Sequence, residues 1–210
     1  MKLYTSEGNP TGRKVEAVFK HIGLDYQIKM LSFEDGEMRS DTFKQINPNG
    51  LIPALEDGDR KVWESNAIIT YLCTEKSPDH DLFKPAQRPE IMQWMFWEAA
   101  QYNAALRMII WETFVKPHFN LGETNNNIVQ VGQENFMRWA DVLNKHLEGR
   151  EFVVGNNWTL ADYSIGYLEP MVGNLPIDLA SFPNVQGFYE RMANNPHWAA
   201  TAPDKSEKAA

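Results

Sequence analysis

The order of periodic segments in the first 80 residues limits the possible folds most strongly. Residues 2–5 have the composition of a short strand. Residues 11–22 predict a helix, ended by Gly23, because apolar side chains recur every three or four positions along one face. Residues 26–30 alternate apolar and polar side chains, which is typical of a half-buried strand. Two strands joined through a helix should be parallel, with a right-handed crossover.

A hairpin and a further helix follow this unit. Asp57 and Gly58 separate two apolar runs, residues 52–55 and 61–64, and Asp-Gly is a strong hairpin signal. A helix is expected after Ser65. Order β-α-β followed by β-β-α predicts an α/β thioredoxin-like domain over residues 1–77.

The remaining chain predicts a separate all-α domain. Residues 78–89 contain three prolines, which resist helix formation, and are interpreted as a linker. Residues 90–200 are expected to be helical, beginning with a long helix over residues 90–116, which contain neither glycine nor proline. Residues 201–210 are expected to form a loose polar tail.

A later helix start is marked by a capping box. Thr159 and Asp162 have the spacing at which each side chain bonds the other residue's amide. Trp158 and Tyr163 are placed to form the accompanying hydrophobic staple. We therefore expect a structural role for all four residues.

Composition narrows the possible partners and compartments. The net charge is −8, without a basic stripe, which argues against nucleic acid binding. No apolar run is long enough to span a membrane, so no membrane association is expected. The single cysteine, Cys73, lies among apolar helix residues and favours a structural thiol in a cytoplasmic protein. The five histidines lie far apart in sequence, so no metal site is predicted.

The first candidate site is the turn before the first helix. Helix N-termini carry unpaired amides and partial positive charge, which stabilise an anion such as a thiolate. Asn9 and Thr11 add side-chain donors at the same place. The alternative is that one of them only caps the helix.

Two further stretches could bind the rest of an extended ligand. Pro53 begins a strand, where it marks an edge or a special bond. A cis Ile52–Pro53 bond would turn the Ile52 backbone outward, where it could pair with a peptide. Glu64 suits an ammonium, and Ser65 with the helix amides behind it suits a carboxylate. A thiolate site, a peptide-pairing edge and a site for an amino-acid end together match glutathione.

These stretches resemble the glutathione transferase family, and residues 8–14 and 93–97 look closer to a bacterial group similar to the nu class. The resemblance rests on residues 47–55, 64–68 and 159–163, and it covers nearly the whole chain. It implies that Ile52, with Pro53, holds the cysteinyl part of glutathione, and that Glu64 and Ser65 hold the γ-glutamyl part. It also implies a homodimer.

The resemblance places catalysis in the turn that contains Asn9 and Thr11, with asparagine and threonine exchanged relative to the nu-like pattern. Tyr4 and Ser6 are alternative contacts to the sulfur.

The expected function is a transferase that activates the glutathione thiolate. The thiolate would attack an electrophilic small molecule or a disulfide, and Tyr102, Leu106 and Trp111 are candidate walls of the substrate pocket, although core packing would also explain them. One alternative is a non-catalytic glutathione-binding or scaffold protein of the same fold. Another is a specialised reductase of glutathione disulfides.

Overall fold

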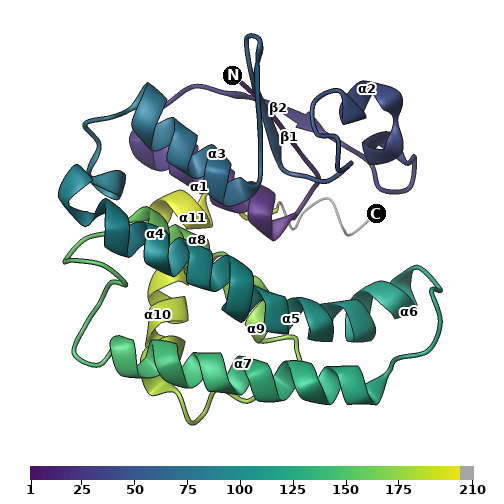
Figure 1. The fold of residues 1–210 in the computed structure, drawn as a ribbon, viewed down its shortest axis with the longest axis vertical. Helices are drawn as coiled ribbons and strands as arrows, with labels where there is room; N and C mark the ends of the chain where they lie inside the picture. Colours follow the sequence, from purple (N-terminus) through teal and green to yellow (C-terminus); the bar gives the residue numbers. More distant parts are fainter. Residues whose placement is uncertain (204–210) are drawn as a thin grey trace. The chain divides into compact units, whose positions relative to one another are not determined.

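The computed structural model describes residues 1–203 (Figure 1). The chain folds into two compact units. Met1–Lys84 form the first unit, together with residues 193–203, and Pro85–Met192 form the second. The first unit contains a sheet and the second is helical, as predicted.

The sheet of the first unit has four strands in the order β2-β1-β3-β4. β1 runs parallel to β2, with Leu3 opposite Ile28, and antiparallel to β3, with Leu3 opposite Leu55. β3 and β4 form the predicted hairpin, in which Gly58 has the positive φ of 59° that the tight turn requires. The elements of this part are β1 (Lys2–Thr5), α1 (Pro10–Ile22), β2 (Gln27–Met30), α2 (Asp41–Lys44), β3 (Ala54–Asp57), β4 (Arg60–Trp63) and α3 (Ser65–Tyr71).

The expectation of a half-buried β2 is wrong. All four residues of β2 are exposed, and Ile28 and Met30 expose 40% and 49% of their surface. β2 is an edge strand that pairs only with β1 in the described sheet. Alternation therefore identified the strand but not its exposure, because burial depends on what covers an edge.

Helices cover the two faces of the sheet differently. α1 and α3 pack side by side (Figure 1), and Gly12 of α1 lies against the side chain of Thr5. Tyr4 points to the opposite face, because successive strand residues alternate. There it packs near Phe43 of α2, with ring centroids 5.8 Å apart. Each face of β1 is thus buried, which holds the end of this strand firmly.

The second unit is built on a long helical path from Arg88 to His118, where one helix over residues 90–116 was predicted. Two π-helical stretches, Glu98–Tyr102 and Trp111–Val115, widen it. The helices of this unit are α4 (Arg88–Trp97), α5 (Asn103–Ile110), α6 (Lys116–His118), α7 (Asn126–His146), α8 (Leu160–Gly166), α9 (Glu169–Val172) and α10 (Pro183–Ala193).

The capping box at the start of α8 is confirmed. Oδ2 of Asp162 accepts hydrogen bonds from the Thr159 amide and hydroxyl, both at 2.8 Å, and Oδ1 accepts one from the Val153 amide at 2.7 Å. Trp158 and Tyr163 pack with ring centroids 6.1 Å apart, as a staple requires. Asp162 is fully buried, and burial raises its pKa to about 6 against the opposing effect of these hydrogen bonds.

The end of the described chain differs from the expected division at residue 200. α11 (Pro196–Ala199) belongs to the first unit, because it packs on α1. The guanidinium of Arg13 lies 4.1 Å from the Trp198 ring, and its Nε donates to the Thr201 carbonyl at 3.0 Å. Thr201 is therefore held, although a loose tail was predicted from residue 201. Residues 204–210 of that tail lie outside the described part.

Candidate functional site

Strand register brings the three predicted stretches to one end of the sheet. β1 ends at Thr5, directly before the turn that leads into α1. Ala54, the first residue of β3, pairs with Tyr4 on one side and with Trp63 on the other. Residues 6–12, Ile52–Pro53 and Glu64–Ser65 therefore leave the sheet at the same end. This convergence is the basis of the candidate site.

Asn9 caps α1. Its Oδ1 accepts hydrogen bonds from the Gly12 amide and from the Thr11 hydroxyl, both at 2.7 Å. The Asn9 carbonyl accepts from the Arg13 amide at 2.9 Å. Asn9 thus performs the capping role considered as the alternative, and the proton of the Thr11 hydroxyl is already used.

Two donors remain at this helix start. Pro10 has no amide hydrogen, and the Gly12 and Arg13 amides are bonded to Asn9. Within residues 1–203, the Thr11 amide and Nδ2 of Asn9 have no hydrogen-bond acceptor. Because Oδ1 is turned toward the helix, Nδ2 on the other side of the amide is directed away from it. An incoming anion would meet the Thr11 amide, Nδ2 of Asn9 and the positive end of the helix dipole.

Only glycine fits at position 12. A Cβ there would lie 1.9 Å from Oγ1 of Thr5. Thr5 is 1% exposed, and its hydroxyl has no hydrogen-bond partner among the described residues. The helix start is therefore pressed directly onto the end of β1.

The Ile52–Pro53 bond is cis, as predicted. The ladder between β1 and β3 begins at Ala54, so the Ile52 backbone lies beyond it. Asn47 is 3% exposed and braces the preceding loop by donating from Nδ2 to the Leu51 carbonyl at 2.6 Å. The Ile52 side chain packs against the core between the sheet and α2. These contacts hold a backbone segment that the sheet leaves unpaired.

The start of α3 corrects the expectation that this helix begins after Ser65. Glu64, not Ser65, is the N-cap, and its side chain makes no capping hydrogen bond. Glu64 has a φ of 69°, which is uncommon for a residue with a side chain and is typical of functional turns. Ser65 is the first helical residue, so its hydroxyl is not used as a cap. Glu64 is exposed and Ser65 half-buried, so both can reach a ligand.

Tyr4 is committed elsewhere. Its hydroxyl donates to Oε2 of Glu56 at 2.9 Å, and Glu56 pairs with Lys2 near the other end of β1. Burial, followed by the interaction with Glu56, raises the pKa of Tyr4 to about 12. Ser6 lies in the site turn, is 7% exposed, and accepts from the Asn9 amide through its carbonyl. Of these two alternatives, only Ser6 lies at the site.

Two predicted walls of the substrate pocket are core residues. Tyr102 and Leu106 are 0% exposed, and the Tyr102 hydroxyl lies 3.0 Å from that of Tyr189. Their helical spacing turned them into the interior of the second unit, so the predicted pocket role does not fit them. Trp111 exposes 49% of its surface and is accessible to a small molecule.

Sequence reasoning missed two buried cations on α1. Arg13 is 8% exposed and Lys14 is 1% exposed, although a helix surface normally places such residues in water. Their neighbours come from the far end of the chain and from α3, so spacing along α1 gave no signal. Cys73 behaves as predicted, since it is fully buried and burial raises its pKa to about 12.

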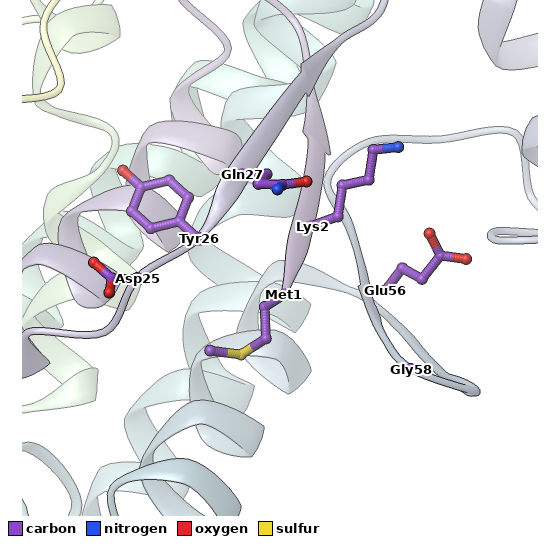
Figure 2. A pocket seen from close by; sticks show the side chains of 7 residues that line it. All are labelled: Met1, Lys2, Asp25, Tyr26, Gln27, Glu56 and Gly58. Carbon is purple, nitrogen blue, oxygen red and sulfur yellow. The ribbon is translucent and has the colours of Figure 1, made fainter.

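A hollow of about 480 Å³ lies at the opposite end of the sheet (Figure 2). It is shallow, its lining is about equally polar and apolar, and it shares no residue with the predicted site. Its lining residues are Met1, Lys2, Asp25, Tyr26, Gln27, Glu56 and Gly58.

The part of the chain from residue 1 to residue 203 contains neither a metal-ligand cluster nor a membrane-spanning helix. No group of histidine, cysteine, aspartate or glutamate side chains in this part could hold a metal ion. Nor does any helix there combine the length and apolar character needed to cross a bilayer.

Comparison with known proteins gives consistent matches. The sequence model described as the glutathione S-transferase N-terminal domain matches residues 1–74, and the one described as the C-terminal domain matches residues 102–196. Probable glutathione S-transferase GSTF2 of Oryza sativa subsp. japonica is 28% identical over 202 residues, covering 93% of both chains. Glutathione transferase URE2P6 of Phanerochaete chrysosporium, solved with oxidized glutathione, has a TM-score of 0.85 at 27% identity. That match covers 95% of this chain and 93% of the other.

Glutathione S-transferase D7 of Drosophila melanogaster is 30% identical over 189 residues, which are 89% of this chain and 81% of the relative. Both domain matches fall on the two kinds of structure observed, the sheet domain and the helical domain. The chain belongs to the glutathione transferase family.

Proposed function

We propose that this protein binds glutathione and activates its thiol for transfer to an electrophilic small molecule or for attack on a disulfide. The observation that carries the proposal is the start of α1, where the Thr11 amide and Nδ2 of Asn9 have no acceptor among residues 1–203 and lie beside a helix dipole. A thiol has a pKa near 8.5, and lowering it by two units requires about 3 kcal/mol. One or two hydrogen bonds and a helix N-terminus supply energies of that size.

The other two stretches suit the rest of the tripeptide. The Ile52 backbone, beyond the β1–β3 ladder, would pair with the cysteinyl residue beside Pro53. Glu64 would take the γ-glutamyl ammonium, and the Ser65 hydroxyl with the first amides of α3 would take its carboxylate. The solved relative URE2P6 was obtained with oxidized glutathione, which supports this ligand class.

The binding assignment is tested by Glu64→Ala and Ser65→Ala. Each variant loses a charge-assisted contact of about 1.5–3 kcal/mol, so each should bind glutathione at least tenfold more weakly in calorimetry. Because Ser65 does not cap α3, Ser65→Ala should melt within about 1 °C of wild type. Unchanged affinity in both variants would remove the assignment.

The reaction is tested on the wild-type protein. Turnover of an aryl halide would support transfer to an electrophile, and turnover of hydroxyethyl disulfide would support reduction of a disulfide. Glutathione binding with neither activity would favour a non-catalytic binding protein, a reading that fits the use of Asn9 as a helix cap. We also propose that the protein is a cytoplasmic homodimer. Sedimentation of the purified protein measures its oligomeric state and so tests the dimer.

A further inference from the structure

Lys14 places a charged side chain in the interior of the first unit. It lies in the second turn of α1 and is 1% exposed. Its Nζ donates to Oδ1 of Asn66 at 2.7 Å. Asn66 is the second residue of α3 and follows Glu64 and Ser65 directly. The side chain thus connects α1 with the start of α3.

Burying an ammonium is unfavourable, and an apolar side chain of similar length could fill the same space. The Lys14 ammonium also lies near the N-terminus of α3, whose partial positive charge disfavours a further cation. The same location favours a bound anion. A buried ammonium here therefore adds to the positive potential that an anionic ligand would meet.

The geometry points to Lys14 as a positioning residue for the γ-glutamyl end of glutathione, acting through Asn66. Lys14 holds the Asn66 side chain and with it the turn that presents Glu64 and Ser65, and it adds positive charge near the γ-glutamyl carboxylate. This inference rests on the proposed function, since it concerns how the same ligand is held. No contact between Lys14 and the ligand is required.

The test compares Lys14→Met with wild type, using calorimetry with glutathione and with S-methylglutathione. S-Methylglutathione keeps the γ-glutamyl end but has no ionisable sulfur. Both ligands should bind about tenfold more weakly to the variant. KM for glutathione should rise while kcat and the thiol pKa in the complex stay unchanged, because the α1 start is intact. Lys20→Met, the same substitution at an exposed position of α1, is the matched control and should leave both affinities unchanged.

Asn66→Ala supplies the second variant, and it decides the question alone if Lys14→Met does not fold. It should lower the affinity for both ligands with kcat retained, and Lys14→Met should add little in its background. Full affinity in either single variant overturns the inference, as does an equal Lys14 effect with and without Asn66. A change confined to kcat or to glutathione would also overturn it. A wild-type protein that binds neither ligand would instead refute the proposed function.

Discussion

At the start of α1, Asn9 accepts two hydrogen bonds through Oδ1, and Thr11 supplies one of them. The sequence predicted that both side chains donate hydrogen bonds to sulfur, but in the structure the two side chains have different roles. Thr11 fixes the orientation of the Asn9 amide, while Nδ2 of Asn9 is available to a ligand.

We therefore predict unequal effects of the two substitutions on the thiol pKa of bound glutathione. Asn9→Ala should raise it by about one unit, because it removes a hydrogen bond of about 1.4 kcal/mol and loosens the helix start. Thr11→Val should raise it less, since the Thr11 amide and Nδ2 remain. Ultraviolet titration of the thiolate in the complex measures both. An unchanged pKa in the double variant would move the sulfur contact to Ser6.

Asp162 is a buried carboxylate that accepts hydrogen bonds from the Val153 and Thr159 amides, and these bonds hold the start of α8. We predict that Asp162→Ala lowers the free energy of unfolding by about 2–4 kcal/mol, because it leaves the Val153 and Thr159 amides buried without acceptors. Chemical denaturation measures this loss. The fraction of Asp162→Ala that folds should keep the wild-type KM for glutathione. A variant that melts normally but has lost activity would contradict the structural role.

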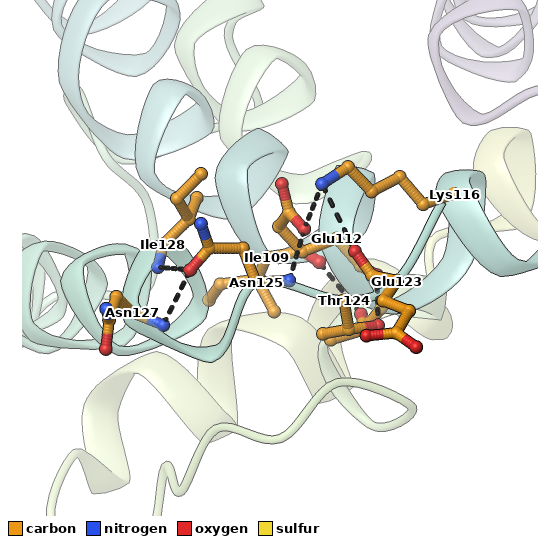
Figure 3. Close-up of polar contacts among 9 residues, drawn as sticks. Ile109, Glu112, Lys116, Glu123, Thr124, Asn125, Asn127 and Ile128 are labelled. Carbon is orange, nitrogen blue, oxygen red and sulfur yellow. Dashed lines mark hydrogen bonds and ion pairs between the residues drawn. The ribbon is translucent and has the colours of Figure 1, made fainter. Parts of the chain in front are cut away.

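At the scale of elements, Glu112 joins the end of the long helical path to the start of α7 (Figure 3). Its side chain is 2% exposed, and its Oε2 accepts from Nζ of Lys116 and from the Asn125 amide, both at 2.7 Å. The Glu112 carbonyl accepts from the Thr124 hydroxyl at 2.8 Å. Asn125 in turn caps α7. One carboxylate thus organises a loop and the helix that follows it.

This arrangement predicts a pH-dependent loss in Glu112→Gln. The hydrogen bond with Lys116, followed by that with the Asn125 amide, lowers the pKa of Glu112 below its usual 4.5. A lowered carboxyl pKa stabilises the fold above the unfolded-state value and loses that effect as pH falls through the folded-state value. The variant should be less stable than wild type at pH 7, and the difference should shrink below about pH 4.5. Denaturation at several pH values measures it, with exposed Glu123→Gln as the control.

At the scale of the whole molecule, the first unit is assembled from both ends of the chain. His21 of α1 stacks on His197 of α11 with ring centroids 4.3 Å apart, and it meets His80 edge-on at 5.3 Å. Burial, then the charges of His197 and His80, lowers the pKa of His21 to about 4. Burial, then His80 and Lys20, also lowers the pKa of His197.

These shifts predict an acid-sensitive attachment of α11. A histidine whose pKa is lowered in the folded state stabilises the fold above pH 6.5, and this contribution is lost as pH falls toward 4. His21→Gln should therefore flatten the fall in unfolding free energy across that window, measured by denaturation. Asp162, with its raised pKa, acts in the opposite direction, so the readout is the difference from wild type. His118→Gln, at an exposed position, should leave the slope unchanged.

The sequence by itself determined the features that depend on neighbours along the chain. The β-α-β and β-β-α order, the hairpin signalled by Asp57–Gly58 and the Thr159–Asp162 capping box all arise from local periodicity or short spacings, and the structure contains each of them. The hairpin turn itself lies one residue later than predicted, at Gly58 and Asp59, because Asp57 pairs with Arg60 as the last residue of β3. The cis Ile52–Pro53 bond was predicted from one proline at a strand start together with the proposed ligand.

Tertiary structure decided which side chains meet across long separations. His21, His80 and His197 form one cluster, Lys14 reaches Asn66, and Tyr102 turns into the core. It also decided that the Thr11 hydroxyl donates a hydrogen bond to Oδ1 of Asn9, because side-chain rotamers at a helix start depend on the neighbouring elements that pack against it. Periodicity records which face of an element is apolar, but the partner of a buried charge is chosen only when separate elements pack together.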